Sequence, residues 1–302
     1  MTIGIVGLGL MGQALAGRLV CQTQPVLGFD IDAGKTATVA SAGIDICTSF
    51  SDLLQRARYV VLCVYSGKQA LKLLNQCPNT RTLGDQRIFI CTATCDPSEL
   101  IDMQHILEPL GHRLIEMPIS GSSKQFAAGQ AMGLVACNPD LFDQHKALCE
   151  SISPTIRHIG HRYGDAAKAK LAINLVLGIN RAAMAEGLAF ANAIGLDSDM
   201  FFSVLHDSAA YSQVMDIKGP IMTQRRFDPP QSRVDQSHKD FGLIIALAER
   251  FGMSLPFAQR YRDMLADNIA CNQGHLDNAI IIEAIERFGK NGHSTTSPPS
   301  KA

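Results

Sequence analysis

Residues 164–193, GDAAKAKLAINLVLGINRAAMAEGLAFANA, set the organisation of the chain. The stretch has no proline and is rich in Ala, Leu and Met, so it predicts one helix roughly 40 Å long. From Leu171 to Ile179 only Asn174 is polar, and the apolar residues follow no single stripe, which indicates a helix buried on most sides. Lys170 lies one turn before Asn174 on the same face. The pair is either a solvated lysine beside a satisfied core amide or part of a site, and the rest of the chain must decide.

A glycine-rich motif lies near the N-terminus. A short β-type run ending at Val6 leads directly into Gly7-Leu8-Gly9-Leu10-Met11-Gly12, and a helical pattern follows. A GxGxxG motif between a strand and a helix predicts a dinucleotide site. Gly7 permits a tight turn, Gly9 lets the backbone approach a pyrophosphate, and Gly12 allows close helix packing.

Asp30 follows the next β-type run, residues 25–29. A carboxylate at this point accepts hydrogen bonds from the adenosine ribose and repels a 2′-phosphate, so NAD is favoured over NADP. In the alternative interpretation Asp30 is an ordinary turn residue beside Asp32, and Lys35 keeps NADP open.

Further β-type runs alternate with helical patterns and predict a mostly parallel, doubly wound sheet. These runs are residues 59–64, 88–91, 114–116 and 133–136. Ligands bind at the carboxyl ends of such strands. The loops expected there are residues 64–66, 92–94 and 117–123. The last combines small hydroxyl side chains with a glycine, so it is either a cradle for a carboxylate or a linker.

From residue 164 the alternation stops, and helical patterns cover residues 165–194, 199–206, 235–251 and 256–271. The predicted fold class is therefore α/β: a Rossmann-type sheet, then an all-α domain joined to it by a long interdomain helix. We expect a dinucleotide-binding domain at residues 1–163 and a helical substrate and dimerisation domain at 164–289. Residues 290–302, rich in Ser, Thr and Pro, are expected to be a disordered tail.

The overall composition favours small-molecule chemistry. The net charge is -1, from 27 basic and 28 acidic residues. The sequence therefore lacks the excess of positive charge that is typical of proteins that bind nucleic acid or an anionic membrane. Nine cysteines without a CxxC motif indicate reduced thiols, and no zinc-type spacing is present, so no metal is expected. We also expect no leader and no apolar run of the roughly 18 to 20 residues that span a membrane. The sequence therefore predicts a cytoplasmic protein.

Five motifs, taken in order, resemble those of the β-hydroxyacid dehydrogenase family. They are GIVGLGLMG at residues 4–12, TCDP at 94–97, EMPISGSSKQFAAG at 116–129, GDAAKAKLAIN at 164–174 and HKD at 238–240. The resemblance extends to about residue 288 and implies hydride transfer between NAD(P) and a small 3-hydroxy carboxylate, or its semialdehyde or keto form.

The resemblance also implies residue roles. The family's catalytic lysine corresponds to Lys170 rather than Lys168, as general acid/base for the substrate hydroxyl, and Asn174 orients the same group. The substrate carboxylate is held by Ser120, Gly121 and Ser122, and Lys239 lies beside the nicotinamide and the substrate. The implied cofactor contacts are Gly7, Gly9, Leu10, Met11, Gly12, Asp30, Val64, Tyr65, Thr94 and Lys239.

Departures from the family pattern leave the substrate open. Where the family usually has DAPVSGG this chain has EMPISGS, so Ser122 replaces a glycine. Tyr211 either lines the substrate pocket or packs in the fold. Two alternative functions remain: imine reduction on the same scaffold, whose enzymes generally lack the lysine, and a catalytically silent dinucleotide-binding protein. Apolar patterns at residues 182–194 and 279–288 predict a homodimer or homotetramer.

Overall fold

The computed structural model describes residues 2–22, 25–77 and 86–291, and they form two compact units, Met1–Ile173 and Asn174–Ala302. The units divide inside the long helix α8 (Asp165–Ala193), whereas the sequence-based boundary lies just before that helix. The predicted tail begins too early by two residues, because α13 (Ile281–Asn291) continues through residues 290 and 291. The remainder, residues 292–302, lies outside the described residues.

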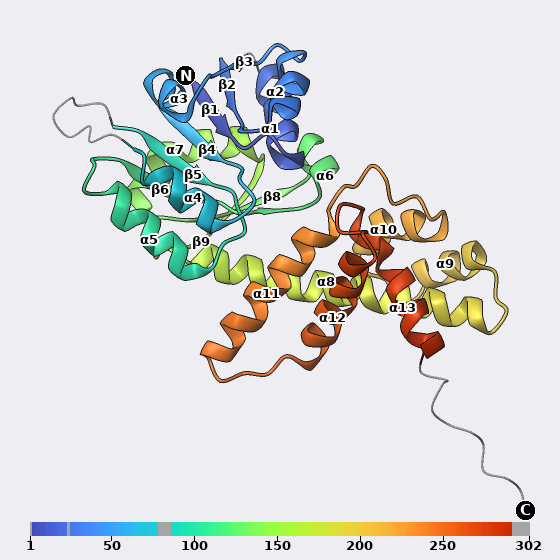
Figure 1. The fold of residues 1–302 in the computed structure, drawn as a ribbon. Coiled ribbons are helices and arrows are strands. Elements are labelled where there is room, and N and C mark those ends of the chain that lie inside the picture. The colour runs from blue at the N-terminus through green and yellow to red at the C-terminus, as the bar shows by residue number, and fades with distance from the viewer. Residues whose placement is uncertain (1, 23–24, 78–85, 292–302) are drawn as a thin grey trace, which may run out of the picture. The chain divides into compact units, whose positions relative to one another are not determined.

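The first unit contains one sheet with the strand order β3-β2-β1-β4-β5-β6-β8-β7, and β9 pairs with β8 (Figure 1). The strands are β1 (Ile3–Val6), β2 (Val26–Phe29), β3 (Asp45–Ile46), β4 (Tyr59–Leu62), β5 (Ile88–Cys91), β6 (Arg113–Glu116), β7 (Ile119–Ser120), β8 (Met132–Ala136) and β9 (Thr155–Gly160). The first six strands are parallel in the order of a doubly wound nucleotide-binding sheet, and β8 runs antiparallel to β6 and β7. The predicted fold class is confirmed.

The strands end in register, and this alignment creates the ligand edge of the sheet. Val6 is the partner of both Phe29 and Leu62, Leu62 is the partner of Cys91, and Cys91 is the partner of Glu116. The residues that follow these five positions therefore leave the sheet at one edge. They include the glycine-rich motif, Asp30 and the loops after β4, β5 and β6.

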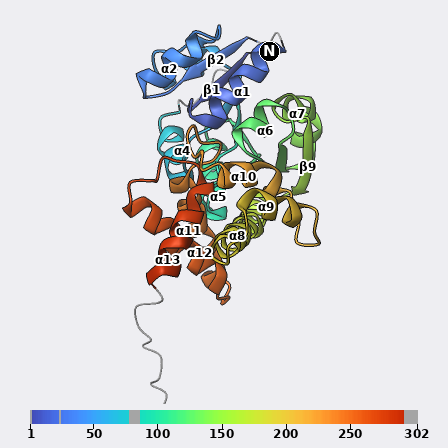
Figure 2. The same ribbon diagram turned by 90° about the vertical axis from the view of Figure 1, so that its right-hand side faces the viewer.

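Helices cover both faces of this sheet, because its central strands are apolar on both sides. One face packs against α1 (Leu10–Cys21), α6 (Ser123–Ala127) and α7 (Pro139–Ile152). The other face packs against α3 (Phe50–Arg56), α4 (Gly67–Leu74) and α5 (Pro97–Leu107). Figure 2 shows α4 on the opposite side of the unit from α6 and α7. Helix α2 (Ala33–Ala40) lies between β2 and β3 in the chain. Helix α5 begins with a capping box: Asp96 accepts from Ser98 N, and Glu99 Oε2 accepts from Asp96 N at 2.9 Å.

The second unit is helical. It comprises the rest of α8 with α9 (Ser198–His206), α10 (Val214–Thr223), α11 (Val234–Arg250), α12 (Pro256–Ala270), the short 3-10 helix η1 (Asn278–Ile280) and α13. Helix α8 packs closely on α11 at Gly178, where an added Cβ would lie 2.4 Å from the Phe241 ring. Arg181 Nη1 donates to the Tyr261 hydroxyl on α12 at 2.6 Å, so the second-unit part of α8 is fixed to both α11 and α12.

Among the described residues, α8 is the one helix long and apolar enough, by length and composition, to cross a membrane. By this measure the expectation of no such stretch is wrong. About 33% of its most apolar window is buried, and the core helices of soluble proteins pass the same test.

Candidate active site

The three glycines of the glycine-rich motif have different surroundings. Gly7 has φ +92°, and a Cβ there would lie 2.7 Å from the Cys63 carbonyl oxygen. A Cβ at Gly12 would lie 1.9 Å from the Gly7 carbonyl oxygen, whereas a Cβ at Gly9 would meet no atom within 4 Å. The first and third glycines are therefore required by the fold itself, and the second borders open space.

The N-terminus of α1 faces that open space. Gly9 is its N-cap, no side chain caps the helix, and no acidic residue lies in its first turn. Uncapped N–H groups with the positive end of the helix dipole form an anion site. Met11 packs partly into the core and Leu10 is 36% exposed. These features fit the pyrophosphate of a dinucleotide held by residues 7–12.

Asp30 is held in place by two backbone donors. Leu8 N donates to Asp30 Oδ2 at 2.7 Å, and Asp32 N donates to Asp30 Oδ1 at 2.9 Å. Each carboxylate oxygen keeps further acceptor capacity for a ribose hydroxyl. The next residue, Ile31, is 92% exposed and carries no charge. Lys35 is the nearby cation that could favour the 2′-phosphate of NADP, and its Nζ pairs with the Asp32 carboxylate at 3.4 Å.

The other predicted cofactor contacts follow β4 and β5. Val64 packs partly against the core, and Thr94 is buried. Tyr65 is partly exposed, and its backbone N–H donates to Gln69 Oε1 at 3.0 Å. Because that N–H is already used, a contact from Tyr65 to the cofactor would have to use its carbonyl group or its ring.

The predicted carboxylate loop starts as a short strand. Ser120 is the partner of Met132 on β8, and Gly121 adopts φ +147° with its would-be Cβ 2.7 Å from Ala131 Cβ. Ser122 caps α6: its Oγ accepts from Gln125 N at 3.3 Å, and its own N–H donates to Gln125 Oε1 at 2.8 Å. The backbone N–H of Ser122 is thus used inside the loop, but its hydroxyl can still donate a proton to a ligand.

Met132 brings the Ser120 loop close to the helix that carries Lys170. Met132 packs, together with Ala169 and Ile173 of α8, on a buried cluster that includes Leu134 of β8. Ala169 and Ile173 flank Lys170 on the helix, and Met132 is the cross-strand partner of Ser120. Lys170 itself is 6% exposed. The first unit therefore gathers the predicted acid/base and the predicted carboxylate loop around β8.

In the second unit, Asp240 joins two predicted site residues. Asn174 Nδ2 donates to Asp240 Oδ2 at 3.1 Å, and Lys239 Nζ lies 3.0 Å from Asp240 Oδ1. Asp240 is 7% exposed. Asp240 has no role among the sequence-based predictions, although it is the last residue of the HKD motif. A buried carboxylate beside two predicted site residues makes Asp240 a further candidate.

Tyr211 belongs to a surface cluster. Its hydroxyl donates to Asp216 Oδ2 at 2.8 Å, and His206 Nε2 lies 2.9 Å from Asp216 Oδ1. Hydrogen bonds to Asp216 and Asp207 raise the pKa of His206. The structure thus gives Tyr211 a partner within the second unit, and its contact with substrate stays a prediction.

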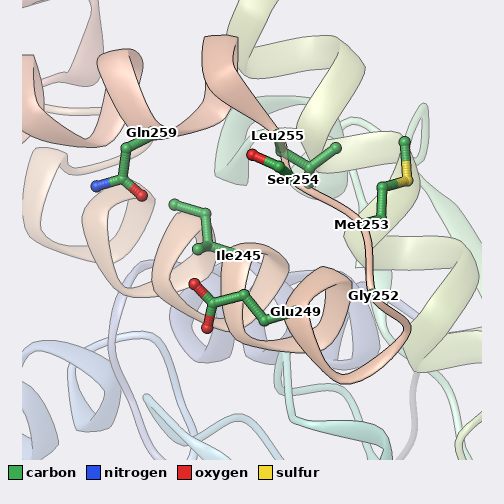
Figure 3. A pocket seen from close by; sticks show the side chains of 7 residues that line it. All are labelled: Ile245, Glu249, Gly252, Met253, Ser254, Leu255 and Gln259. Atoms are coloured by element: carbon green, nitrogen blue, oxygen red, sulfur yellow. The ribbon is translucent and has the colours of Figure 1, made fainter.

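A pocket of about 370 Å³ lies where α11 ends and α12 begins, and none of the predicted site residues lines it. Figure 3 shows its lining residues: Ile245, Glu249, Gly252, Met253, Ser254, Leu255 and Gln259. It carries neither a glycine-rich motif nor an assigned acid/base, so we do not place the chemistry there.

Comparison with known proteins agrees with this geometry. Residues 2–160 match the family model described as the NAD binding domain of 6-phosphogluconate dehydrogenase. Residues 164–285 match the model described as NAD-binding of NADP-dependent 3-hydroxyisobutyrate dehydrogenase.

Individual relatives span most of the chain. Glyoxylate/succinic semialdehyde reductase 1 of Arabidopsis thaliana is 25% identical over 287 residues, which are 95% of this chain and 99% of that protein. Cytokine-like nuclear factor N-PAC of Drosophila melanogaster is 24% identical over 257 residues, 84% of this chain but 42% of that protein. The crystal structure of 3-hydroxyisobutyrate dehydrogenase from Salmonella typhimurium has the same fold, with a TM-score of 0.83 at 21% identity, over 94% of this chain and 99% of that one. The chain belongs to the β-hydroxyacid dehydrogenase family of NAD(P)-dependent oxidoreductases.

Proposed function

We propose that this protein transfers a hydride between NAD and a small 3-hydroxy carboxylate, or the matching semialdehyde or keto acid. One observation carries the proposal: Met132 pairs with Ser120 and packs in the same cluster as the two α8 residues that flank Lys170. A loop suited to a carboxylate and a buried lysine suited to acid/base work thus lie at the ligand edge of a nucleotide-binding sheet.

In this proposal the loop after β6 binds the substrate carboxylate, and Lys170 transfers the proton. The hydroxyl groups of Ser120 and Ser122 and the backbone N–H of Gly121 hold the substrate carboxylate. Lys170 Nζ removes the proton from the substrate hydroxyl as the carbon is oxidised, and it returns the proton in reduction. When bound, the nicotinamide accepts or supplies the hydride. Such a positioned acid/base contributes about 100- to 10,000-fold to the rate.

Asn174, which lies four residues after Lys170 on α8, orients the substrate hydroxyl in this proposal. The Asn174 amide donates one N–H to Asp240, which fixes the amide plane and leaves its carbonyl oxygen as an acceptor. Lys239 Nζ lies 3.0 Å from the same carboxylate. Its proposed role beside the nicotinamide and the substrate rests on the family motif HKD. In this proposal Asp240 holds the Asn174 amide and the Lys239 ammonium in place.

The proposed preference for NAD rests on Asp30. Its fixed carboxylate accepts from a ribose diol and repels a 2′-phosphate, while Ile31 offers no positive charge. A clear preference of the purified protein for NADP would contradict this use of Asp30.

A substrate panel tests the function. The purified protein is mixed with small 3-hydroxy acids and either NAD or NADP, and the absorbance of the reduced nicotinamide is followed. In a parallel arm, cyclic imines are offered with the reduced cofactors. We expect turnover of at least one hydroxy acid and loss of most of it in Lys170→Ala. Turnover of imines alone would favour imine reduction, and cofactor binding without any turnover would favour the catalytically silent protein.

A further inference from the structure

Glu116 makes a contact that the proposed mechanism does not use. It is the last residue of β6, its side chain is 1% exposed, and it accepts a hydrogen bond from Gly164 N at 2.7 Å. Its other carboxylate oxygen accepts from Ala167 N. Both donors belong to the start of α8, where a helix leaves its first backbone N–H groups without partners. A strand residue 48 positions earlier in the chain thus caps the long helix.

This cap acts close to Lys170. Ala167 lies one turn before Lys170 on the same helix, so the position of the first turn determines where the lysine is presented. The apolar face of the turn rests on β8 through Ala166, which shares a buried cluster with Leu134 and Ala136. Apolar packing of this kind limits sideways movement of the helix but does not define its position along its own axis. Two directed hydrogen bonds from the first turn to one carboxylate define that position.

An ionisable group is a costly choice for a purely structural cap at this depth. Burial raises the pKa of Glu116 to about 7, although the N–H groups of Gly164 and Ala167 act in the opposite direction. The other charged groups that act on it are Asp165, which raises its pKa, and Lys168, which lowers it. The Cys137 thiol and the Tyr163 hydroxyl also lie close enough to be affected by its charge. An apolar side chain would avoid this desolvation.

Glu116 also borders the carboxylate loop. Met117 and Pro118 are all that separate it from β7, which ends at Ser120, and Glu116 pairs with Ala136 of β8. One residue therefore connects the strand that leads into the loop with the helix that presents the lysine.

We propose that Glu116 is a positioning residue that holds the first turn of α8 against the end of β6 and thereby places Lys170 relative to the Ser120 loop. This inference rests on the proposed role of Lys170 as acid/base. Glu116 touches neither substrate nor cofactor in this scheme and acts through the helix.

The test compares Glu116→Gln, Glu116→Asp and a control, Asp165→Asn, in the full chain. The control removes a first-turn carboxylate of the same helix, one that pairs with Lys168 at 3.2 Å. The measurements are kcat and KM for the best hydroxy acid of the panel, the thermal midpoint at pH 8, and hydrogen exchange of the amides in residues 164–172.

We expect Glu116→Gln to lower kcat about 100-fold, the order caused by a misplacement of about 1 Å, while KM changes less than about threefold. The thermal midpoint at pH 8 should stay within about 4 °C of the parent, because removal of a buried charge offsets a lost hydrogen bond. Exchange of the first-turn amides should accelerate. Glu116→Asp, which keeps the charge, should recover part of kcat, and Asp165→Asn should resemble the parent.

Three results overturn the inference. The first is an unchanged kcat in Glu116→Gln. The second is a parallel loss of kcat and thermal stability, which marks a structural role only. The third is a first turn whose amide exchange does not change. Failure of the proposed function is recorded separately, as absence of turnover in the parent or full activity of Lys170→Ala.

Discussion

The glycine-rich motif allows a substitution that separates cofactor binding from folding. Gly9 has φ -72° and ψ -165°, a conformation open to any L-residue, and a Cβ there meets no protein atom within 4 Å. Gly9→Ala should therefore fold normally and even gain about 0.4–1 kcal/mol from the reduced entropy of the unfolded chain. The same methyl group occupies the space that we assign to the pyrophosphate. Loss of one N–H bond to a charged oxygen there costs about 1.5–3 kcal/mol, so Kd for the cofactor should rise about 10- to 150-fold.

The assay pairs isothermal titration of the reduced cofactor with urea unfolding. Gly17→Ala is a matched control, because Gly17 lies on the same helix and a Cβ there also meets nothing within 4 Å. It should stabilise the fold by about 1 kcal/mol through helix propensity and leave Kd unchanged. Gly12→Ala, which would place its Cβ 1.9 Å from the Gly7 oxygen, should instead destabilise the fold. If Gly9→Ala binds the cofactor as tightly as the parent, the pyrophosphate does not occupy the space beside Gly9.

Three further predictions concern stability and specificity. Asp277→Asn breaks the buried ion pair with Lys218 Nζ at 2.8 Å. The free energy of unfolding, measured by urea denaturation, should fall by about 3–5 kcal/mol. A loss below about 1 kcal/mol would contradict the importance of that pair. Because burial raises the pKa of Glu116 from 4.5 to about 7, the folded state binds more protons between these values, and its free energy of unfolding should fall by about 3 kcal/mol as pH rises through this window. Urea unfolding at several pH values should show this loss in the parent but not in Glu116→Gln, and equal pH dependence in both proteins would count against it. Asp30→Ser should lower the ratio of the NADP Kd to the NAD Kd at least about tenfold, because a charge that repels the 2′-phosphate is removed, and an unchanged ratio would show that Asp30 does not select the cofactor.

The central sheet could be predicted from sequence because its strands are short apolar runs buried on both faces, with turn residues between them. Three strands could not. The two-residue strands β3 and β7 are too short to show a period, and β9 (TIRHIG) alternates between exposed and half-buried positions without an apolar face. Helix α10 was also missed, because it carries Pro220 in its interior, a residue that normally ends a helical pattern.

The candidate site, too, could be predicted from the sequence only in part. The glycine-rich motif can be recognised in the sequence because the residues that would contact the cofactor are consecutive. The contacts that connect the site join residues far apart in the chain: Asn174 and Asp240 are 66 positions apart, and Glu116 lies 48 positions from Gly164. No local pattern encodes such pairs. Glu116 in particular looks like an ordinary strand end until the fold brings α8 to it.

The central claim is that Lys170 is the acid/base, and the chemical step of Lys170→Met tests it most directly. Single-turnover formation of the reduced nicotinamide is measured for the parent, Lys170→Met and Lys168→Met, together with cofactor Kd. Lys168 is a matched control because it lies on the same helix, is half exposed and pairs with Asp165. We expect a rate at least about 100-fold lower in Lys170→Met with cofactor Kd unchanged, and a near-parent rate in Lys168→Met. A rate for Lys170→Met within a few-fold of the parent would contradict it.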